Sequence, residues 1–171
     1  MKKTLFLSLF FGFLLFAQDL KAADDSTGIT PYVFYQVWEA MDNGVDVARG
    51  EKILLNRGYK KLGTYENMVG YNMVYAKAAN VKVGTDGFVK SATPGKGSGY
   101  SSYIQVGPGV GMDWAMSVTF LTKAGTDAFI KLLKKAGYTK HGTAWKRADG
   151  LYFFQRERTF SVSSVADADD F

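Results

Sequence analysis

Residues 58–64 (GYKKLGT) return later in the chain as residues 137–143 (GYTKHGT), at a constant offset of 79 residues. An apolar pair precedes both copies at the same distance, Ile53-Leu54 in one and Leu132-Leu133 in the other. Similarity at a fixed offset is the sequence signature of internal repetition. The pattern therefore predicts that the chain contains two related halves.

The second half, about residues 110–165, is expected to be a β-α-β-β repeat. Residues 112–122 (MDWAMSVTFLT) are rich in β-branched and aromatic side chains, which favours a strand. Thr126 or Asp127 can cap the following helix, and Gly137 can end it in a left-handed conformation. Three further strands are predicted at residues 143–146, 151–156 and 159–165, with a turn at 148–150.

The first half, about residues 30–84, is expected to repeat this order. Asp46 can cap a helix over residues 47–57 that Gly58 ends. A hairpin is predicted to follow, with strands at residues 71–77 and 80–83.

The first element of this half, residues 32–41, has two interpretations. By analogy with the second half it should be a strand. Its apolar residues also recur at helical spacing, at Val33, Phe34, Val37, Trp38 and Met41. Both alternatives stay open from the sequence.

The two halves are joined by a glycine- and serine-rich stretch, residues 91–102 (SATPGKGSGYSS), which predicts a flexible loop. Two such repeats favour an α+β fold that packs two helices on an antiparallel sheet. Residues 23–171 are therefore expected to form one domain of two tandem repeats.

The N-terminal residues 1–22 have the pattern of a secretory signal peptide. Two lysines precede an apolar run of 14 residues, which is too short to span a bilayer, and Ala22 offers a small residue for cleavage. No later stretch is apolar enough to cross a membrane. We expect a bacterial protein that is periplasmic or secreted, with no transmembrane segment in the mature chain.

Composition excludes several chemistries. The 171 residues contain no cysteine and one histidine, so disulfides, thiolate nucleophiles and sites with two imidazoles are ruled out. Residues 95–99 (GKGSG) and 107–111 (GPGVG) lack the spacing of nucleotide-binding loops, and no GxSxG motif occurs. We therefore expect no catalytic residue, metal site or cofactor.

Charge indicates the kind of partner. Residues 26–166 hold 18 Lys or Arg against ten Asp or Glu, whereas both ends of the mature chain are acidic. A basic surface attracts anions. Cations and aromatics alternate in the second half, and the Gly-rich loop adds a lysine and a tyrosine. The candidate ligand-binding residues are Trp145, Lys146, Arg147, Tyr152, Arg156, Arg158, Lys96 and Tyr100.

The sequence thus favours an exported, non-enzymatic binding protein that engages a protein, a glycan or another anionic partner, with no specific nucleic acid. Two alternatives remain: a small exported hydrolase of glycan or peptidoglycan with dispersed carboxylates, and a structural subunit of an envelope complex. For the candidate residues, the alternative is a sheet whose aromatics fill the core while its cations face water.

Overall fold

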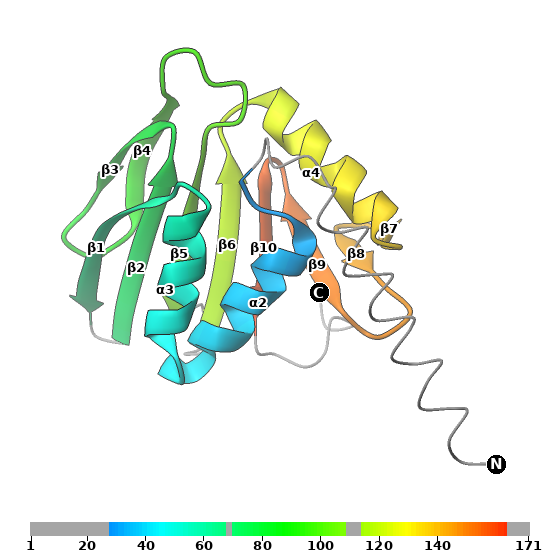
Figure 1. The fold of residues 1–171 in the computed structure, drawn as a ribbon, viewed down its shortest axis with the longest axis horizontal. Coiled ribbons are helices and arrows are strands. Elements are labelled where there is room, and N and C mark those ends of the chain that lie inside the picture. Colours follow the sequence, from blue (N-terminus) through cyan, green and yellow to red (C-terminus); the bar gives the residue numbers. More distant parts are fainter. Residues whose placement is uncertain (1–27, 68–69, 109–113, 164–171) are drawn as a thin grey trace.

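The computed structural model describes residues 28–163 except 68–69 and 109–113, and it shows an α+β fold (Figure 1). Three α-helices lie in the described part, with one short 3-10 helix between the first two. Their bounds are α2 Pro31–Met41, η2 Asp42–Gly44, α3 Val47–Asn56 and α4 Lys123–Lys135. The expected signal peptide lies outside the described residues.

Eight antiparallel strands form the main sheet, in the order β1-β2-β5-β6-β10-β9-β8-β7. Two further strands, β3 and β4, pair only with each other. The strands of the first part are β1 Lys60–Asn67, β2 Gly70–Lys77, β3 Ala79–Val83, β4 Val89–Pro94 and β5 Ser102–Pro108. The others are β6 Trp114–Phe120, β7 Thr139–His141, β8 Ala144–Lys146, β9 Tyr152–Arg156 and β10 Thr159–Ser163.

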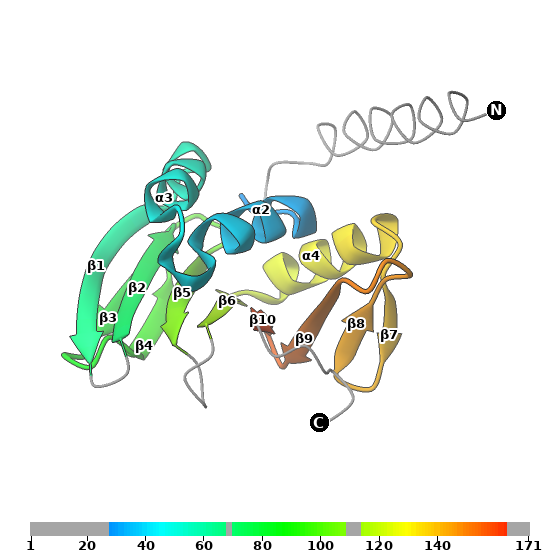
Figure 2. The same cartoon turned by 90° about the horizontal axis from the view of Figure 1, so that it is seen from below.

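All three α-helices lie on one side of the main sheet (Figure 2). Side chains alternate between the two faces of a strand, so Met116, Val118 and Phe120 of β6 are buried beneath the helices. Ser117 and Thr119 point to the opposite side and are half-buried. We call this second side the helix-free face.

The β3–β4 hairpin covers part of the helix-free face, on the side opposite to the helices (Figure 2). Val74 and Asn72 of β2 point away from the helices, yet they are only 0% and 4% exposed. Asn72 Nδ2 donates a hydrogen bond of 3.4 Å to the carbonyl oxygen of Asp86, between β3 and β4. The hairpin therefore shields β2.

The two matched sequence motifs end their helices in the same way. Gly58 and Gly137 adopt φ values of +82° and +86°. The N–H of Tyr59 donates to the carbonyl oxygen of Leu54 at 3.1 Å, and the N–H of Tyr138 donates to that of Leu133 at 3.0 Å. This is the hydrogen bond of a Schellman motif. The predicted helix ends at both glycines are confirmed.

Residues 32–41 belong to helix α2, so the strand expected from the duplication is wrong and the helical periodicity is correct. Pro31 occupies the first turn, where its missing N–H costs nothing, and the Thr30 hydroxyl accepts from the N–H of Val33 at 3.2 Å. The apolar stripe of α2 packs into the core. The first half therefore does not have a β-α-β-β order, and within the described residues three α-helices, not two, lie on the sheet.

The expected hairpin of residues 71–77 and 80–83 is also wrong. β2 pairs with β1 and β5, while β3 pairs with β4. Ala78 lies between β2 and β3 with φ +47°, an uncommon conformation for a residue other than glycine. The chain leaves the main sheet at this point.

The loop in the Gly/Ser-rich stretch is shorter than the expected residues 91–102, because β4 extends to Pro94 and β5 begins at Ser102. Helix α4 begins at Lys123, since the Thr122 hydroxyl caps it by accepting from the N–H of Gly125 at 3.2 Å. The predicted cap at Thr126 or Asp127 is therefore wrong.

The strands expected around residues 143–146, 151–156 and 159–165 are found as β8, β9 and β10 within the described range. The sequence did not predict β1, β4 or β7, the last of which is a strand of three residues at the edge of the sheet. Residues 109–111 of the GPGVG stretch, 112–113 of the predicted strand and 164–165 at the chain end lie outside the described residues.

Candidate functional site

A groove of about 700 Å³ opens where the helix-free face meets the upper end of the sheet in Figure 1. It lies between β4 on one side and the end of β6 and the start of β10 on the other. The groove is lined by Ala92, Thr119, Phe120, Leu121, Lys123, Glu157, Arg158 and Thr159.

Two threonines from neighbouring strands lie together in this groove. Thr119 of β6 and Thr159 of β10 are directly opposite each other, and their hydroxyl oxygens are 2.9 Å apart. A hydroxyl has one donor and two acceptor positions, so the pair retains hydrogen-bonding capacity toward a ligand. The register of β6 against β10 thus builds a polar surface.

Arg158 is fixed at the rim of the groove. Its Nη1 donates a hydrogen bond of 3.0 Å to the carbonyl oxygen of Leu121, at the end of β6. A guanidinium has five N–H donors in a planar fork, so this exposed hydrogen bond orients the group and leaves other donors for a ligand.

Lys123 adds a second cation, from the first residue of α4. Its Nζ lies 2.5 Å from Asp127 Oδ2, but the two side chains are 81% and 56% exposed. Ion pairs this exposed contribute little, because water and salt screen them. An anion in the groove can therefore compete for Lys123.

Glu157 supplies the one carboxylate among the groove-lining residues. It occupies the tight turn that joins Arg156 of β9 to Thr159 of β10, where these two residues face each other. Its φ of +53° lies in the left-handed region, which favours glycine. Gln155 Nε2 donates to the carbonyl oxygen of Glu157 at 3.0 Å and holds the turn.

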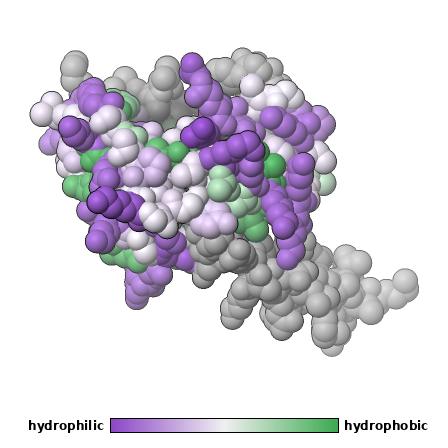
Figure 3. All heavy atoms as spheres, turned by 90° about the horizontal axis from the view of Figure 1, so that it is seen from above, coloured by the Kyte–Doolittle hydropathy of each residue, from purple (hydrophilic) through white to green (hydrophobic). Residues whose placement is uncertain are grey.

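The shortened Gly-rich loop, residues 95–101, is attached beside the groove. The N–H of Leu121 donates to the carbonyl oxygen of Ser101 at 2.8 Å, and the Thr122 hydroxyl donates to that of Gly99. Tyr100, between Gly99 and Ser101, therefore lies next to the start of α4, and Lys96 belongs to the same loop. Seen from above, this end of the molecule is mostly hydrophilic (Figure 3).

The helix-free face continues from the groove along β9. Arg156, Phe154 and Tyr152 alternate with core-facing residues, so all three share this face. The rings of Tyr152 and Phe154 meet edge to face, with centroids 5.1 Å apart. Lys146 of β8 lies opposite Tyr152. Three of the predicted residues, Lys146, Tyr152 and Arg156, are thus on one surface.

Trp145 is on the opposite, helix-covered face. Its side chain is 2% exposed, and its Nε1 donates to Gln155 Oε1 at 2.8 Å. Lys140 Nζ lies 5.7 Å from the centre of the Trp145 ring at the β7 edge. Trp145 therefore contributes to the core, as the alternative interpretation expected for the aromatics.

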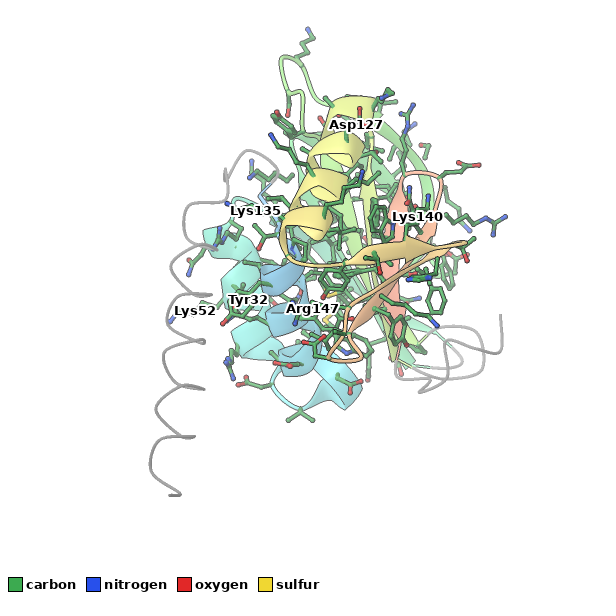
Figure 4. The ribbon with its side chains drawn as sticks, turned by 90° about the vertical axis from the view of Figure 1, so that its right-hand side faces the viewer. Tyr32, Lys52, Asp127, Lys135, Lys140 and Arg147 are labelled. Carbon is green, nitrogen blue, oxygen red and sulfur yellow. The ribbon has the colours of Figure 1, made fainter. Side chains whose placement is uncertain are left out.

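Arg147 also belongs to the helix side, where Figure 4 places it beside α2. Its guanidinium lies 5.1 Å from the centre of the Tyr138 ring, and Nη2 is 2.5 Å from Asp149 Oδ2. The hydrogen bonds from Arg147 hold the pKa of the Asp149 carboxyl below its usual value. Burial raises the pKa of Tyr138 to about 12. This cluster fixes the β8–β9 turn against the core.

The structure places the predicted residues at different locations. Arg158 lines the groove, and elements that adjoin it contain Arg156, Lys96 and Tyr100. Lys146 and Tyr152 lie farther along the same face. Trp145 and Arg147 do not join them. Of the eight groove-lining residues the sequence predicted only Arg158, and it missed the polar residues Thr119, Lys123, Glu157 and Thr159.

Within residues 28–67, 70–108 and 114–163, no group of three or more His, Cys, Asp or Glu side chains is placed to hold a metal ion. Across the same ranges, no helix has the length and hydropathy needed to cross a bilayer. The single histidine, His141, is exposed, and its Nε2 lies 3.0 Å from the Thr139 hydroxyl. No protein-family model, curated protein or solved structure matches this chain.

Proposed function

We propose that this chain is an exported, non-enzymatic protein that binds an anionic partner on its helix-free face, with the groove at Arg158 as the centre of the site. One observation carries the proposal. Arg158 donates a hydrogen bond to the carbonyl oxygen of Leu121 and lines the groove together with Lys123 and the paired threonines Thr119 and Thr159. Cationic and hydroxyl groups converge there on a hollow that opens to solvent.

The surface next to the groove supports an extended ligand. Arg156, Phe154 and Tyr152 follow one another on β9, and Lys146 lies beside them. Arginine binds carboxylate, sulfate and phosphate groups through paired donors, and aromatic rings supply apolar contact area. A partner longer than the groove can therefore also contact the exposed Arg156.

Exposure of these charges determines how binding should respond to salt. Arg156 and Arg158 are exposed, so their attraction to an anion is screened at high ionic strength. The affinity for the anionic partner should therefore fall as the salt concentration rises.

We further propose that the two halves descend from one copied unit. The support is local: each copy joins a helix to a strand through a left-handed glycine and a buried tyrosine, with the same hydrogen bond. The proposed export of residues 23–171 to the periplasm or cell exterior, by a bacterium, is supported by the N-terminal sequence pattern alone.

The binding proposal is tested with residues 23–171 on immobilised heparin, a polyanion. The Arg156→Ala/Arg158→Ala variant should elute at clearly lower salt than the wild type, because two cations leave the proposed site. The matched control is Lys131→Ala/Lys135→Ala, which removes the same charge from the exposed side of α4. Equal shifts in both variants would contradict the site.

The same wild-type protein tests the non-enzymatic part. It is incubated with peptidoglycan and with heparin, and the products are separated by size. We expect polymers of unchanged length. Shortened chains would instead support the hydrolase alternative and overturn the proposed absence of catalysis.

A further inference from the structure

We infer that the ligand group in the groove is an acidic saccharide, whose anionic group binds Arg158 and Lys123 and whose hydroxyl groups bind Glu157, Thr119 and Thr159. This inference rests on the proposed binding function and names the ligand class for the same site.

The groove carries both negative and positive side chains. Glu157 lines the groove together with Arg158 and Lys123. A carboxylate repels a bare anion, so a site for phosphate or sulfate alone would be weakened by Glu157. The same carboxylate is a strong acceptor for a neutral O–H group. A ligand that carries both an anion and hydroxyl groups satisfies both kinds of side chain.

The turn that carries Glu157 has an uncommon backbone geometry. The φ of +53° at Glu157 is uncommon for a residue other than glycine, and Ala78 is the only other such residue in the described part of the chain. Strained residues of this kind concentrate at functional sites. No described side chain forms an ion pair with the Glu157 carboxylate. The turn thus places the carboxylate of Glu157 at the groove, although its left-handed backbone conformation costs free energy.

The hydroxyl groups and the size of the groove also suit a saccharide. The hydroxyls of Thr119 and Thr159 can each donate and accept, as the hydroxyls of a sugar can. The volume of about 700 Å³ lies within the range of small-ligand sites. A short oligosaccharide therefore fits the groove in size and in hydrogen-bonding chemistry.

The inference is tested by isothermal titration of residues 23–171 with four probes. Trigalacturonate carries carboxylates on sugar rings, and a heparin tetrasaccharide adds sulfates; the two distinguish the source of the anionic group. Maltotriose is a sugar without charge, and tricarballylate has three carboxylates without a sugar. We expect at least one acidic saccharide to bind roughly tenfold or more tightly than both comparison probes, because anion and hydroxyl contacts then act together.

Glu157→Gln separates a saccharide from a bare anion. The amide is nearly the same shape but loses the charge. We expect it to weaken the acidic saccharide roughly tenfold and to strengthen tricarballylate, because a repulsion has been removed. Lys135→Gln, on the exposed side of α4, is the control and should leave both affinities unchanged.

The outcomes distinguish this inference from the proposed function. If Glu157→Gln strengthens or does not change saccharide binding while Arg158→Ala weakens it, the site binds anions but the saccharide assignment is overturned. If no probe binds better than maltotriose and heparin elution is also unaffected by the arginine variant, the proposed function fails as well.

Discussion

The hydroxyl of Tyr35 on α2 bonds to both backbone groups of Tyr152 on β9, 117 residues later in the chain. The N–H of Tyr152 donates to the Tyr35 oxygen at 2.8 Å, and the Tyr35 hydroxyl donates to the carbonyl oxygen of Tyr152. The Tyr35 ring also meets the buried ring of Phe153 edge to face, with centroids 5.1 Å apart. One side chain thus connects helix α2 to the strand that carries Tyr152 and Phe154 on the helix-free face.

Tyr35→Phe should lower the free energy of unfolding by about 1–3 kcal/mol, because it leaves part-buried backbone groups of Tyr152 without their partner. Urea denaturation followed by tryptophan fluorescence measures this change. Tyr32→Phe, on the same helix but 42% exposed, is the control and should be close to neutral. Equal losses in the two variants would show that the Tyr35 hydroxyl has no special role.

Gly58→Ala and Gly137→Ala should each cost about 1–2 kcal/mol of stability, since both positions need a left-handed backbone. The cost comes from the backbone, because the nearest side-chain atoms to an added Cβ lie 3.7 Å away at Gly58 and 4.0 Å away at Gly137. Gly99→Ala has open space around it and should change stability little. Thermal and urea unfolding of the three variants compare them. A large loss at one of the matched glycines and none at the other would argue against equivalent helix ends.

Alkaline pH should destabilise the fold through its buried tyrosines. Burial raises the pKa of Tyr138 to about 12, whereas a tyrosine in the unfolded chain titrates near 10. The unfolded state therefore loses its proton first, and the stability that Tyr138 contributes is fully present below pH 10 and is lost as pH rises toward 12. Urea midpoints measured from pH 8 to pH 11.5 should stay level at first and then fall.

Tyr138→Phe provides the control for this pH dependence. Phenylalanine cannot ionise, so the variant should gain stability relative to the wild type as pH rises above 10. A difference between the two proteins that stays constant over this range would contradict the assignment to Tyr138.

Several local signals were read correctly from the sequence, although the cap of α4 lies at Thr122 and not at Thr126 or Asp127. Asp46 caps α3 as expected, since its Oδ1 accepts from the N–H of Arg49 at 3.1 Å. Gly58 and Gly137 end their helices for the same local reason. For residues 32–41 the periodicity of the apolar side chains was a better guide than the analogy between halves, because burial of a helical stripe directly stabilises α2.

The groove could not be predicted, because it depends on pairing between distant segments. Thr119 and Thr159 meet only through the register of β6 against β10, and β4 contributes Ala92 because the chain leaves the main sheet at Ala78. The alternation of side chains along β9 indicated which residues share a face of the sheet, but it did not show which face the helices cover. For that reason Trp145, on the covered side, was grouped with Tyr152 on the other.

Binding of an anionic partner at the Arg158 groove can be followed residue by residue by NMR, with ¹⁵N-labelled residues 23–171 titrated with the heparin tetrasaccharide. We expect the largest amide shifts at Leu121, Lys123, Arg158 and Thr159, and we expect these shifts to vanish in Arg158→Ala. Shifts confined to α2, α3 and the exposed side of α4, or a pattern that Arg158→Ala leaves unchanged, would contradict it.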